Sequence, residues 1–253
     1  MIYQAKYRLI QFISPLLIAF LSLIMIGNSS CTKTADEPLP LSDSIRIGLV
    51  AHYLLNKTPN DLTGNNPDMV PVNVSIQLSG RNNNVDEYAY YFAGNPNSYA
   101  RCILNNNKAV KGALSISFWA KETGPGTYSP RLFEFWPGNY GVGFYWFNWY
   151  QNKIKWAGSD FELPSNQVLN SKQWYHFVVT NDIYTTKVYC NGKMVARQNQ
   201  PGNLPPAAIQ LSPYFELGRL AQRPADAFEG AIRDFRIYNR TLSDNEVNFL
   251  SNL

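Results

Sequence analysis

The sequence has few histidines and cysteines and no strong excess of charge of either sign. It contains two histidines among 253 residues, and no Ser or Cys nucleophile motif accompanies His176. We therefore expect that side chain to be packed and hydrogen-bonded. The formal net charge is +4, and it falls to +2 without residues 1–31 because that segment carries Lys6 and Arg8. A chain so close to neutrality gives no electrostatic reason to bind nucleic acid.

Long apolar runs are absent after the first 31 residues, and the single run that exists is interrupted. It extends from Leu9 to Ile26 behind a basic head, and Gln11, Ser14 and Pro15 break it. The unbroken part is shorter than the roughly 20 residues of a membrane span. This favours a cleaved export signal over an uncleaved membrane anchor.

Cys31 follows small residues at the end of that run. The arrangement resembles the lipobox of Bacteroidota lipoproteins, in which the thiol is lipidated and becomes the new N-terminus. The resemblance implies a signal peptide over residues 1–31 and an outer-membrane protein held by its acyl chains, each buried methylene contributing about 0.8 kcal/mol. The polar residues 32–47 then predict a flexible tether, and residues 48–253 have the length of one domain.

Cysteine is otherwise scarce, with only Cys102 and Cys190 remaining. In an exported protein these two are permitted to form a disulfide. Alternation in the segment "KVYCNG" places Val188 and Cys190 on the same apolar side, however, and a buried free thiol fits that position equally well. The sequence leaves both alternatives open.

From Gly48 onward the pattern is that of β-strands. Apolar and polar residues alternate over 114–121, and strands are also expected over 174–182 and 185–198, the last with a hairpin turn at Asn191-Gly192. Glycine, proline and asparagine separate many such short segments. This predicts an all-β, two-sheet antiparallel sandwich.

One helix is expected, at the end of the chain. Ser243 and Glu246 have the spacing of a capping box, and Leu242 precedes the cap as a hydrophobic staple would. The helix is expected to lay Val247, Phe249 and Leu250 against the sandwich.

The closing segment, "FEGAIRDFRIYNRTLSDNEV", resembles the end of the laminin-G-like, concanavalin A-like lectin and glucanase domains. Their pattern is G-x-I-D-x-x-R-I-Y-N-R-x-L-S-x-x-E, and here Arg233 replaces the aspartate. The resemblance covers residues 48–251. It implies a jelly-roll sandwich with a short C-terminal helix that binds glycans or protein partners. Some relatives are glycosidases, so the fold alone does not decide the function.

Catalytic carboxylates are not evident in the sequence. The glucanases of this fold carry an E-x-D-x-E triplet on one strand, and none occurs here. The nearest pairs are Asp160 with Glu162, in loop-like sequence, and Asp244 with Glu246, in the helix cap. A glycosidase needs two carboxylates that flank the scissile bond. We therefore expect a protein that is not an enzyme.

A structural calcium ion is a further possibility that the resemblance raises. The segment "NDLTGNNPD" resembles a family loop that helps to bind calcium, and the candidate ligands are Asp61, Asn65, Asn66, Asp68 and Asp234. The alternative is a turn built from residues that tolerate turn geometry. Arg233 favours that alternative, because its guanidinium paired with Asp61 or Asp68 would take the place of the cation.

The stretch 133–156 is the richest in aromatic residues. A hairpin turning at Gln151-Asn152 would pair Trp149 with Ile154 and Phe147 with Trp156, and that face is expected to be core. The other face would combine aromatic rings with amide and ammonium groups, as a sugar-binding surface does. Alternatively, loops cover this face and make it a second small core. The candidate ligand-binding residues are Phe144, Trp146, Asn148, Tyr150, Lys153 and Lys155.

Two functions of different classes remain open. The domain is either a glycan-binding module on a lipid anchor or a structural or adhesive subunit that docks a protein partner. A glycan site is expected to be a concave groove with spaced aromatic side chains and polar groups for hydroxyls. A protein interface is expected to be flatter and more continuous.

Overall fold

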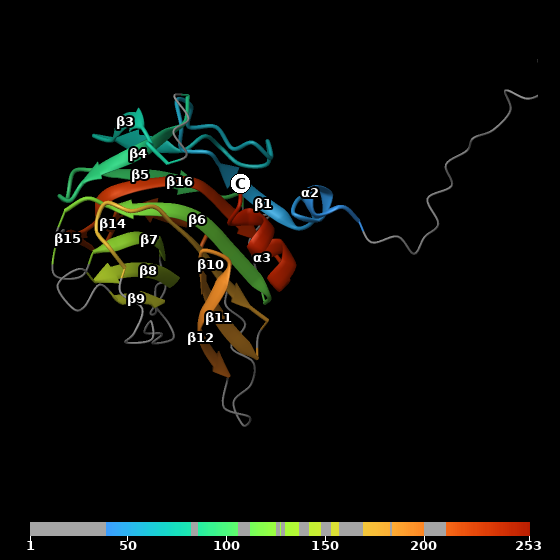
Figure 1. The fold of residues 1–253 in the computed structure, drawn as a ribbon. Coiled ribbons are helices and arrows are strands. Elements are labelled where there is room, and N and C mark those ends of the chain that lie inside the picture. The colour runs from blue at the N-terminus through green and yellow to red at the C-terminus, as the bar shows by residue number, and fades with distance from the viewer. Residues whose placement is uncertain are drawn as a thin grey trace, which may run out of the picture. The chain divides into compact units, whose positions relative to one another are not determined.

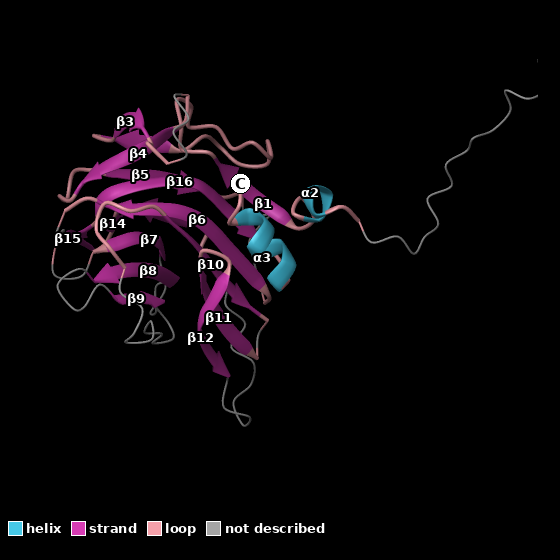
Figure 2. Cartoon of the chain, viewed as in Figure 1, coloured by secondary structure: helices cyan, strands magenta, loops and turns pink. Residues whose placement is uncertain are grey.

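The protein is a β-sandwich in the computed structural model (Figures 1 and 2). The structure describes residues 39–81, 86–105, 112–124, 127, 130–136, 142–147, 153–156, 169–182, 184–199 and 211–253. The chain divides into two units, Met1–Leu39 and Pro40–Leu253, and the fold given below is that of the second unit. The predicted signal peptide and Cys31 lie outside the described residues. Among the described residues, no helix is long and apolar enough to cross a membrane.

The first sheet, sheet A, has eight strands in the order β12-β11-β10-β6-β16-β4-β3, with β1 also paired to β16. The long strand β16 is central because it pairs with β6 along most of its length and with β4 and β1 at its two ends. All of these pairings are antiparallel. The strands are β1 (Leu49–Tyr53), β3 (Ser75–Leu78), β4 (Tyr88–Ala93), β6 (Leu114–Glu122), β10 (Tyr175–Asn181), β11 (Thr185–Cys190), β12 (Lys193–Asn199) and β16 (Glu229–Tyr238).

The second sheet, sheet B, also has eight strands, in the order β14-β15-β7-β13-β5-β2, and β8 and β9 extend it from β7. Its pairings are antiparallel except for a parallel bridge between Ala227 and Arg131. The predicted two-sheet sandwich is therefore confirmed, with one parallel contact. The strands are β2 (Val70–Val72), β5 (Tyr99–Ile103), β7 (Arg131–Trp136), β8 (Val142–Phe147), β9 (Lys153–Trp156), β13 (Tyr214–Leu217), β14 (Arg219–Leu220) and β15 (Arg223–Ala227).

Aromatic side chains fill the space between the sheets. Phe118 of sheet A meets Phe133 and Phe144 of sheet B edge to face, with ring centroids 5.3 and 5.1 Å apart. Such pairs stabilise the fold beyond the area they bury. Cys102 and Cys190 belong to the same core, and both thiols are free. Burial raises the pKa of each thiol to about 12, so each thiol stays protonated at neutral pH.

The helix α3 (Asp244–Leu250) covers part of the outer face of sheet A (Figure 1). Its capping box is confirmed, since Ser243 accepts the amide of Glu246 and the Glu246 carboxylate accepts the amide of Ser243. Val247 and Leu250 are buried against an apolar cluster that the strands supply. The staple residue Leu242 joins this cluster, as the sequence predicts.

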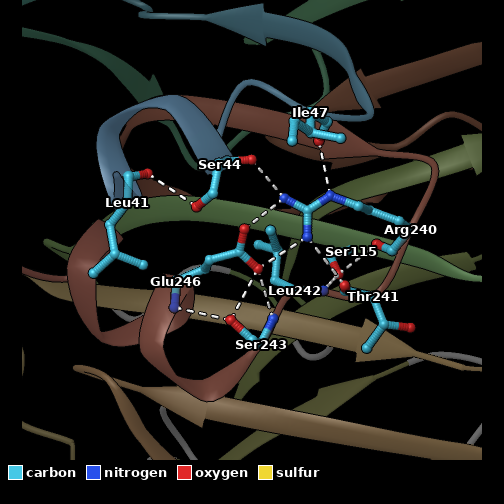
Figure 3. Close-up of polar contacts among 9 residues, drawn as sticks. All are labelled: Leu41, Ser44, Ile47, Ser115, Arg240, Thr241, Leu242, Ser243 and Glu246. Carbon is cyan, nitrogen blue, oxygen red and sulfur yellow. Dashed lines mark hydrogen bonds and ion pairs between the residues drawn. The ribbon is translucent and has the colours of Figure 1, made fainter. Parts of the chain in front are cut away.

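Arg240 fastens the beginning of the domain to its end (Figure 3). Its guanidinium donates to both carboxylate oxygens of Glu246, at 2.9 and 2.7 Å, and to the carbonyls of Ser44 and Ile47, at 2.8 Å each. Ser44 ends the short helix α2 (Leu41–Ser44). The segment that precedes β1 is thus hydrogen-bonded to a residue near the end of the domain.

Candidate functional site

The best candidate for a binding site is an open groove of about 510 Å³ on the outer face of sheet A. It lies over the edge strand β3, its neighbour β4 and the start of β16, away from α3. Its lining combines polar side chains with Tyr91, Phe92 and Ala93. The lining side chains that carry polar groups are Asn73, Ser75, Gln77, Tyr91, Thr123 and Glu229.

Strand register brings these residues together. Ser75 pairs with Tyr91, and Ala93 pairs with Glu229. Paired residues share a face of the sheet, and the face alternates along each strand. Tyr90 and Phe92 are accordingly buried in the core on the opposite face. Small Ala93 leaves room for the groove between the larger side chains.

Tyr91 is held in place by Lys121, whose ammonium also lies over the ring of Trp174. Lys121 donates to the Tyr91 hydroxyl at 2.9 Å and to the Ser79 carbonyl at 3.1 Å. Its ammonium lies 5.2 Å from the centre of the Tyr91 ring and 5.1 Å from that of Trp174, within range of cation–π attraction. Trp174 in turn donates to the Ser79 carbonyl. The Tyr91 ring is thus a prepositioned wall of the groove.

Two glycines surround the side chain of Glu229. A Cβ placed on Gly124 would overlap the Glu229 carboxylate, and one on Gly94 would lie 2.7 Å from the Glu229 Cβ. Gly94 also has φ +65°, a conformation that favours glycine. The two glycines therefore provide the space in which the carboxylate lies at the end of the groove.

Chemically, the groove combines one ring face with hydroxyl, amide and carboxylate groups. Gln77 donates to the Ser75 hydroxyl at 2.8 Å, which orients both side chains. Aromatic faces stack on the C–H surfaces of sugars, and short polar groups bind their hydroxyls. The arrangement is thus suited to a saccharide. The sequence analysis missed it because the residues come from separate segments and only strand register joins them.

A largely buried ionic network occupies the middle of the same outer face. Arg233 forms an ion pair with Glu87, and Arg81 stacks on Trp119 with its guanidinium carbon 4.1 Å from the ring centre. The expected pairing of Arg233 with Asp61 or Asp68 is wrong. In the sheet, Arg233 of β16 stands opposite Trp119 of β6. Its guanidinium reaches Glu87, just before β4. Burial lowers the pKa of Arg233 to about 10.

His176 lies beneath this network. It is 2% exposed, and its Nε2 is 2.9 Å from the Ser117 hydroxyl. Burial lowers its pKa to about 3, so the ring is neutral at physiological pH. The prediction of a packed, hydrogen-bonded histidine is confirmed.

The candidate calcium ligands do not fit a calcium ion. The Asp61 carboxylate accepts the amides of His52 and Thr63 and both the amide and the side chain of Asn66. Burial opposes its charge, but these bonds and that of the Thr63 hydroxyl outweigh burial and lower the pKa of Asp61. Calcium needs oxygen ligands, whereas the groups facing Asp61 are N–H and O–H donors.

Asp234, the other buried carboxylate proposed as a ligand, is also occupied. Its oxygens lie 2.6 Å from His52 Nε2 and accept Arg236 Nε at 2.9 Å. Asp68 is exposed. Within the described ranges, no group of three or more His, Cys, Asp and Glu side chains is arranged to hold a metal.

The predicted register of the aromatic hairpin is wrong. Trp146, and not Trp149, pairs with Ile154. The strands end at Phe147 and begin again at Lys153, so the connection is longer than the two-residue turn assumed. A shift of three residues is odd and exchanges the faces of a strand.

The supposed binding face of this hairpin therefore contributes to the core. Phe144 and Trp146 are each 0% exposed. Trp146 packs edge to face on Phe177 at 5.7 Å, between the two sheets. Backbone register pairs Lys153 with Phe147 and Lys155 with Tyr145, so the two lysines are not in register with the buried rings. Asn148 and Tyr150 lie outside the described residues, as do the side chains of Lys153 and Lys155.

A pair of carboxylates that the sequence did not reveal lies on sheet B. Glu134 of β7 and Glu216 of β13 are cross-strand partners, and such pairs have Cβ atoms about 4.5–5.5 Å apart. Burial raises the pKa of Glu134. Burial opposes the charge of Glu216 too, but hydrogen bonds from Arg219 and Arg101 outweigh it and lower its pKa. Two carboxylates with divergent pKa values are typical of glycosidases.

The surroundings of this pair do not suit catalysis. Glu216 is 1% exposed, and its oxygens accept Arg101 Nε at 3.0 Å, Arg219 Nε at 2.8 Å and the Tyr214 hydroxyl at 2.9 Å. Glu134 is also buried, 3.7 Å from Arg131. A carboxylate held by so many donors is a structural ion pair. Of the two pairs considered from sequence, Asp160 and Glu162 lie outside the described residues. The other serves the helix, with Asp244 accepting the Tyr189 hydroxyl and Glu246 accepting Arg240.

Comparison with known families identifies the superfamily to which this chain belongs. A family model described as the concanavalin A-like lectin/glucanases superfamily matches residues 94–248, more than half of the chain. The chain belongs to this superfamily. Because lectins and glucanases share the fold, membership does not decide whether a member is catalytic. A search of curated proteins found none that matches the chain.

Solved structures with the same fold include domains studied with sugars. Domain 4 of AbnA, a GH43 extracellular arabinanase from Geobacillus stearothermophilus in complex with arabinotriose, has a TM-score of 0.61 and 22% identity. That match covers 80% of this chain and 98% of that domain. The botulinum neurotoxin serotype D ligand binding domain, in complex with N-acetylneuraminic acid, has a TM-score of 0.61 and 20% identity.

A third similar structure is the binding domain of Paraclostridial Mosquitocidal Protein 1, with a TM-score of 0.60 and 21% identity. The matches cover 84% of this chain but only 53% of the mosquitocidal domain and 52% of the neurotoxin domain. The chain thus spans about half the length of these two. At such identities the likeness concerns the fold alone.

Proposed function

We propose that the protein is a non-catalytic glycan-binding module whose ligand lies in the groove over β3 and β4. The observation that carries this proposal is the lining of the groove. It offers the fixed ring of Tyr91 beside the polar side chains of Ser75, Gln77, Thr123 and Glu229. The superfamily match and the two similar domains solved with saccharides support the same ligand class.

The absence of a catalytic role is part of this proposal. It is supported by the state of the Glu134–Glu216 pair, because Glu216 is held by two arginines and a tyrosine. A general acid must reach the leaving oxygen and a nucleophile must reach the sugar carbon. Neither side chain is exposed enough to do so.

A glycan array tests the function, with two tyrosine variants as a matched pair. Tyr91→Ala removes the ring in the groove. Tyr184→Ala removes a ring that is 65% exposed in the turn between β10 and β11. We expect the wild type and Tyr184→Ala to bind the same glycans, and Tyr91→Ala to lose them while keeping its circular dichroism spectrum. Glycan binding that survives in Tyr91→Ala would place the ligand elsewhere.

The proposal includes export and a lipid anchor on Cys31 in the outer membrane of a Bacteroidota-type cell. It is supported by the interrupted apolar run and the small residues before Cys31. Labelled fatty acid is expected to enter the wild type and not Cys31→Ala. Equal labelling of both proteins would contradict a lipid anchor on Cys31.

A second candidate function, docking of a protein partner, is favoured by a different surface. A pocket of about 630 Å³ lies beside α2 and includes Leu62 and Leu253 in its lining. These side chains are 55% and 44% exposed, and Ile47 of the same region is 50% exposed. Exposed apolar groups that gather in this way are typical of interaction surfaces. This function becomes the better account if no glycan binds and Leu62→Glu releases the protein from a complex that the wild type forms.

A further inference from the structure

We propose that Glu229 makes the groove selective for uncharged saccharides over saccharides that carry a carboxylate. This inference rests on the proposed glycan-binding function and concerns the class of glycan that the groove accepts. The negative charge of the Glu229 carboxylate would disfavour ligands that carry a negative charge themselves. This inference also rests on the position of Glu229, on the two glycines around it and on the partners of the nearby cations.

The side chain of Glu229 is placed where a bound sugar would meet it. It begins β16 and pairs with Ala93, a small residue of the groove. Gly94 and Gly124 leave the space that its carboxylate occupies, and any side chain at Gly124 would displace it. Among the described residues, the Glu229 carboxylate forms no hydrogen bond and no ion pair with a neighbour. Its oxygens are therefore available to sugar hydroxyls.

The cations on this face are already engaged. Lys121 donates to the Tyr91 hydroxyl and the Ser79 carbonyl between two aromatic rings. Arg233, further along β16, forms its ion pair with Glu87. Neither of these two cations forms an ion pair with Glu229. Within the part of the chain that the structure describes, the negative charge of Glu229 therefore has no counter-ion in the groove.

An anionic sugar in this groove would meet a like charge. Repulsion between two carboxylates about 4 Å apart is modest in bulk water and several times stronger at a protein surface. A neutral sugar meets only a strong hydrogen-bond acceptor. We therefore expect neutral oligosaccharides to bind on the order of tenfold more tightly than acidic ones of the same linkage, with the difference shrinking at high salt.

The test is a calorimetric titration of the full-length protein in detergent with matched probes. The probes are neutral hexose oligosaccharides and the uronic-acid oligosaccharides of the same length and linkage. Glu229→Gln keeps a polar group of the same size and removes the charge. We expect it to bind neutral probes somewhat more weakly, because an amide is a weaker acceptor than a carboxylate, and to bind acidic probes more tightly, so that the tenfold preference disappears. Asp43→Asn, which removes an equal charge from α2, is expected to leave the preference unchanged.

A second variant tests the geometry without changing the charge. Gly124→Ala places a methyl group where the Glu229 carboxylate now lies. Because the carboxylate is the end of a flexible side chain, it can move aside while the fold persists. We expect the variant to bind neutral probes more weakly, because it loses hydrogen bonds to Glu229. We also expect its preference for neutral over acidic probes to become smaller, because the carboxylate no longer lies at the same place in the groove. It also keeps the proposal testable if Glu229→Gln does not fold.

The outcomes separate this inference from the function on which it rests. Acidic and neutral probes that bind wild type equally, both depending on Tyr91, would overturn the selectivity and leave the glycan site intact. A Glu229→Gln variant that loses neutral binding and gains no acidic binding would likewise overturn it, because Glu229 would then be only a hydrogen-bonding ligand. If no probe binds in a Tyr91-dependent manner, the proposed function itself fails.

Discussion

The outer face of sheet A differs at its two ends, although the same strands β6 and β16 run beneath both. At one end Val178, Tyr189 and Tyr238 are apolar or aromatic, and α3 covers them. At the other end Ser75 and Tyr91 remain partly or largely exposed and line the groove. One half of this sheet face is thus apolar and covered, whereas the other half is open, and it is in the open half that we propose the ligand binds.

The buried ionic network marks the boundary between these halves. On the α3 side Asp234 binds both His52 and Arg236. Towards the groove, Glu87 binds both Arg81 and Arg233. Buried charges need their partners. The network therefore lies between the apolar half that α3 covers and the open half that holds the groove.

The largest effect should come from a tyrosine at the covered end. Tyr238 is 0% exposed beneath α3, and truncating a large buried ring costs about 3–5 kcal/mol. Tyr238→Ala should lower the free energy of unfolding by that amount in urea denaturation. Tyr91→Ala, on the same face at the open end, is the matched control and should cost clearly less. Equal losses in the two variants would contradict the division of the face.

A smaller loss is expected when the cover itself is trimmed. Leu250 of α3 is 1% exposed, and a buried Leu→Ala substitution costs about 2–5 kcal/mol. We expect a value near the lower end because α3 lies at the margin of the domain. Leu250→Ala should leave glycan affinity unchanged, as measured by calorimetry. A loss of affinity would show that the two ends are coupled.

The Arg240 clamp offers a test by pH. Hydrogen bonds from Arg240 lower the pKa of Glu246 from 4.5 to about 2. Since the folded pKa is depressed, the stabilisation is complete above about pH 4.5 and is lost as the pH falls towards 2. Arg240→Met should cost about 1–3 kcal/mol at neutral pH and should flatten this acid dependence. Urea unfolding at about pH 7 and pH 3 measures both effects, and an unchanged acid slope would exclude the clamp as its source.

The smallest effect on stability is expected in the groove. Gln77 is exposed on β3, and exposed substitutions usually change stability by no more than about 0.5 kcal/mol. Gln77→Ala should therefore unfold like the wild type but bind saccharide more weakly, because it loses an amide that bonds hydroxyls. Thermal unfolding and calorimetry on the same sample check both parts. A variant that unfolds early and binds normally would reverse the assignment.

Local signals in the sequence predicted much of the fold. Alternation gave the strands, and the capping box placed α3, because both depend on neighbouring residues. The partner of Arg233, the face of Trp146 and the pairing of Glu134 with Glu216 were not predictable in this way. Each depends on which residues stand opposite one another on separate strands. The groove has the same origin, and the small residues Gly94 and Gly124 beside strand ends were its only local signal.

The central claim is that the groove over β3 and β4 binds the ligand. Its most direct test is a titration of the isotope-labelled protein with a neutral oligosaccharide that the array identifies, followed by amide chemical shifts in NMR spectra. The account predicts shifts that cluster at Ser75, Tyr91, Thr123 and Glu229, with little change in α3. Shifts that cluster instead at β8 and β9, or around the pocket beside α2, would contradict it.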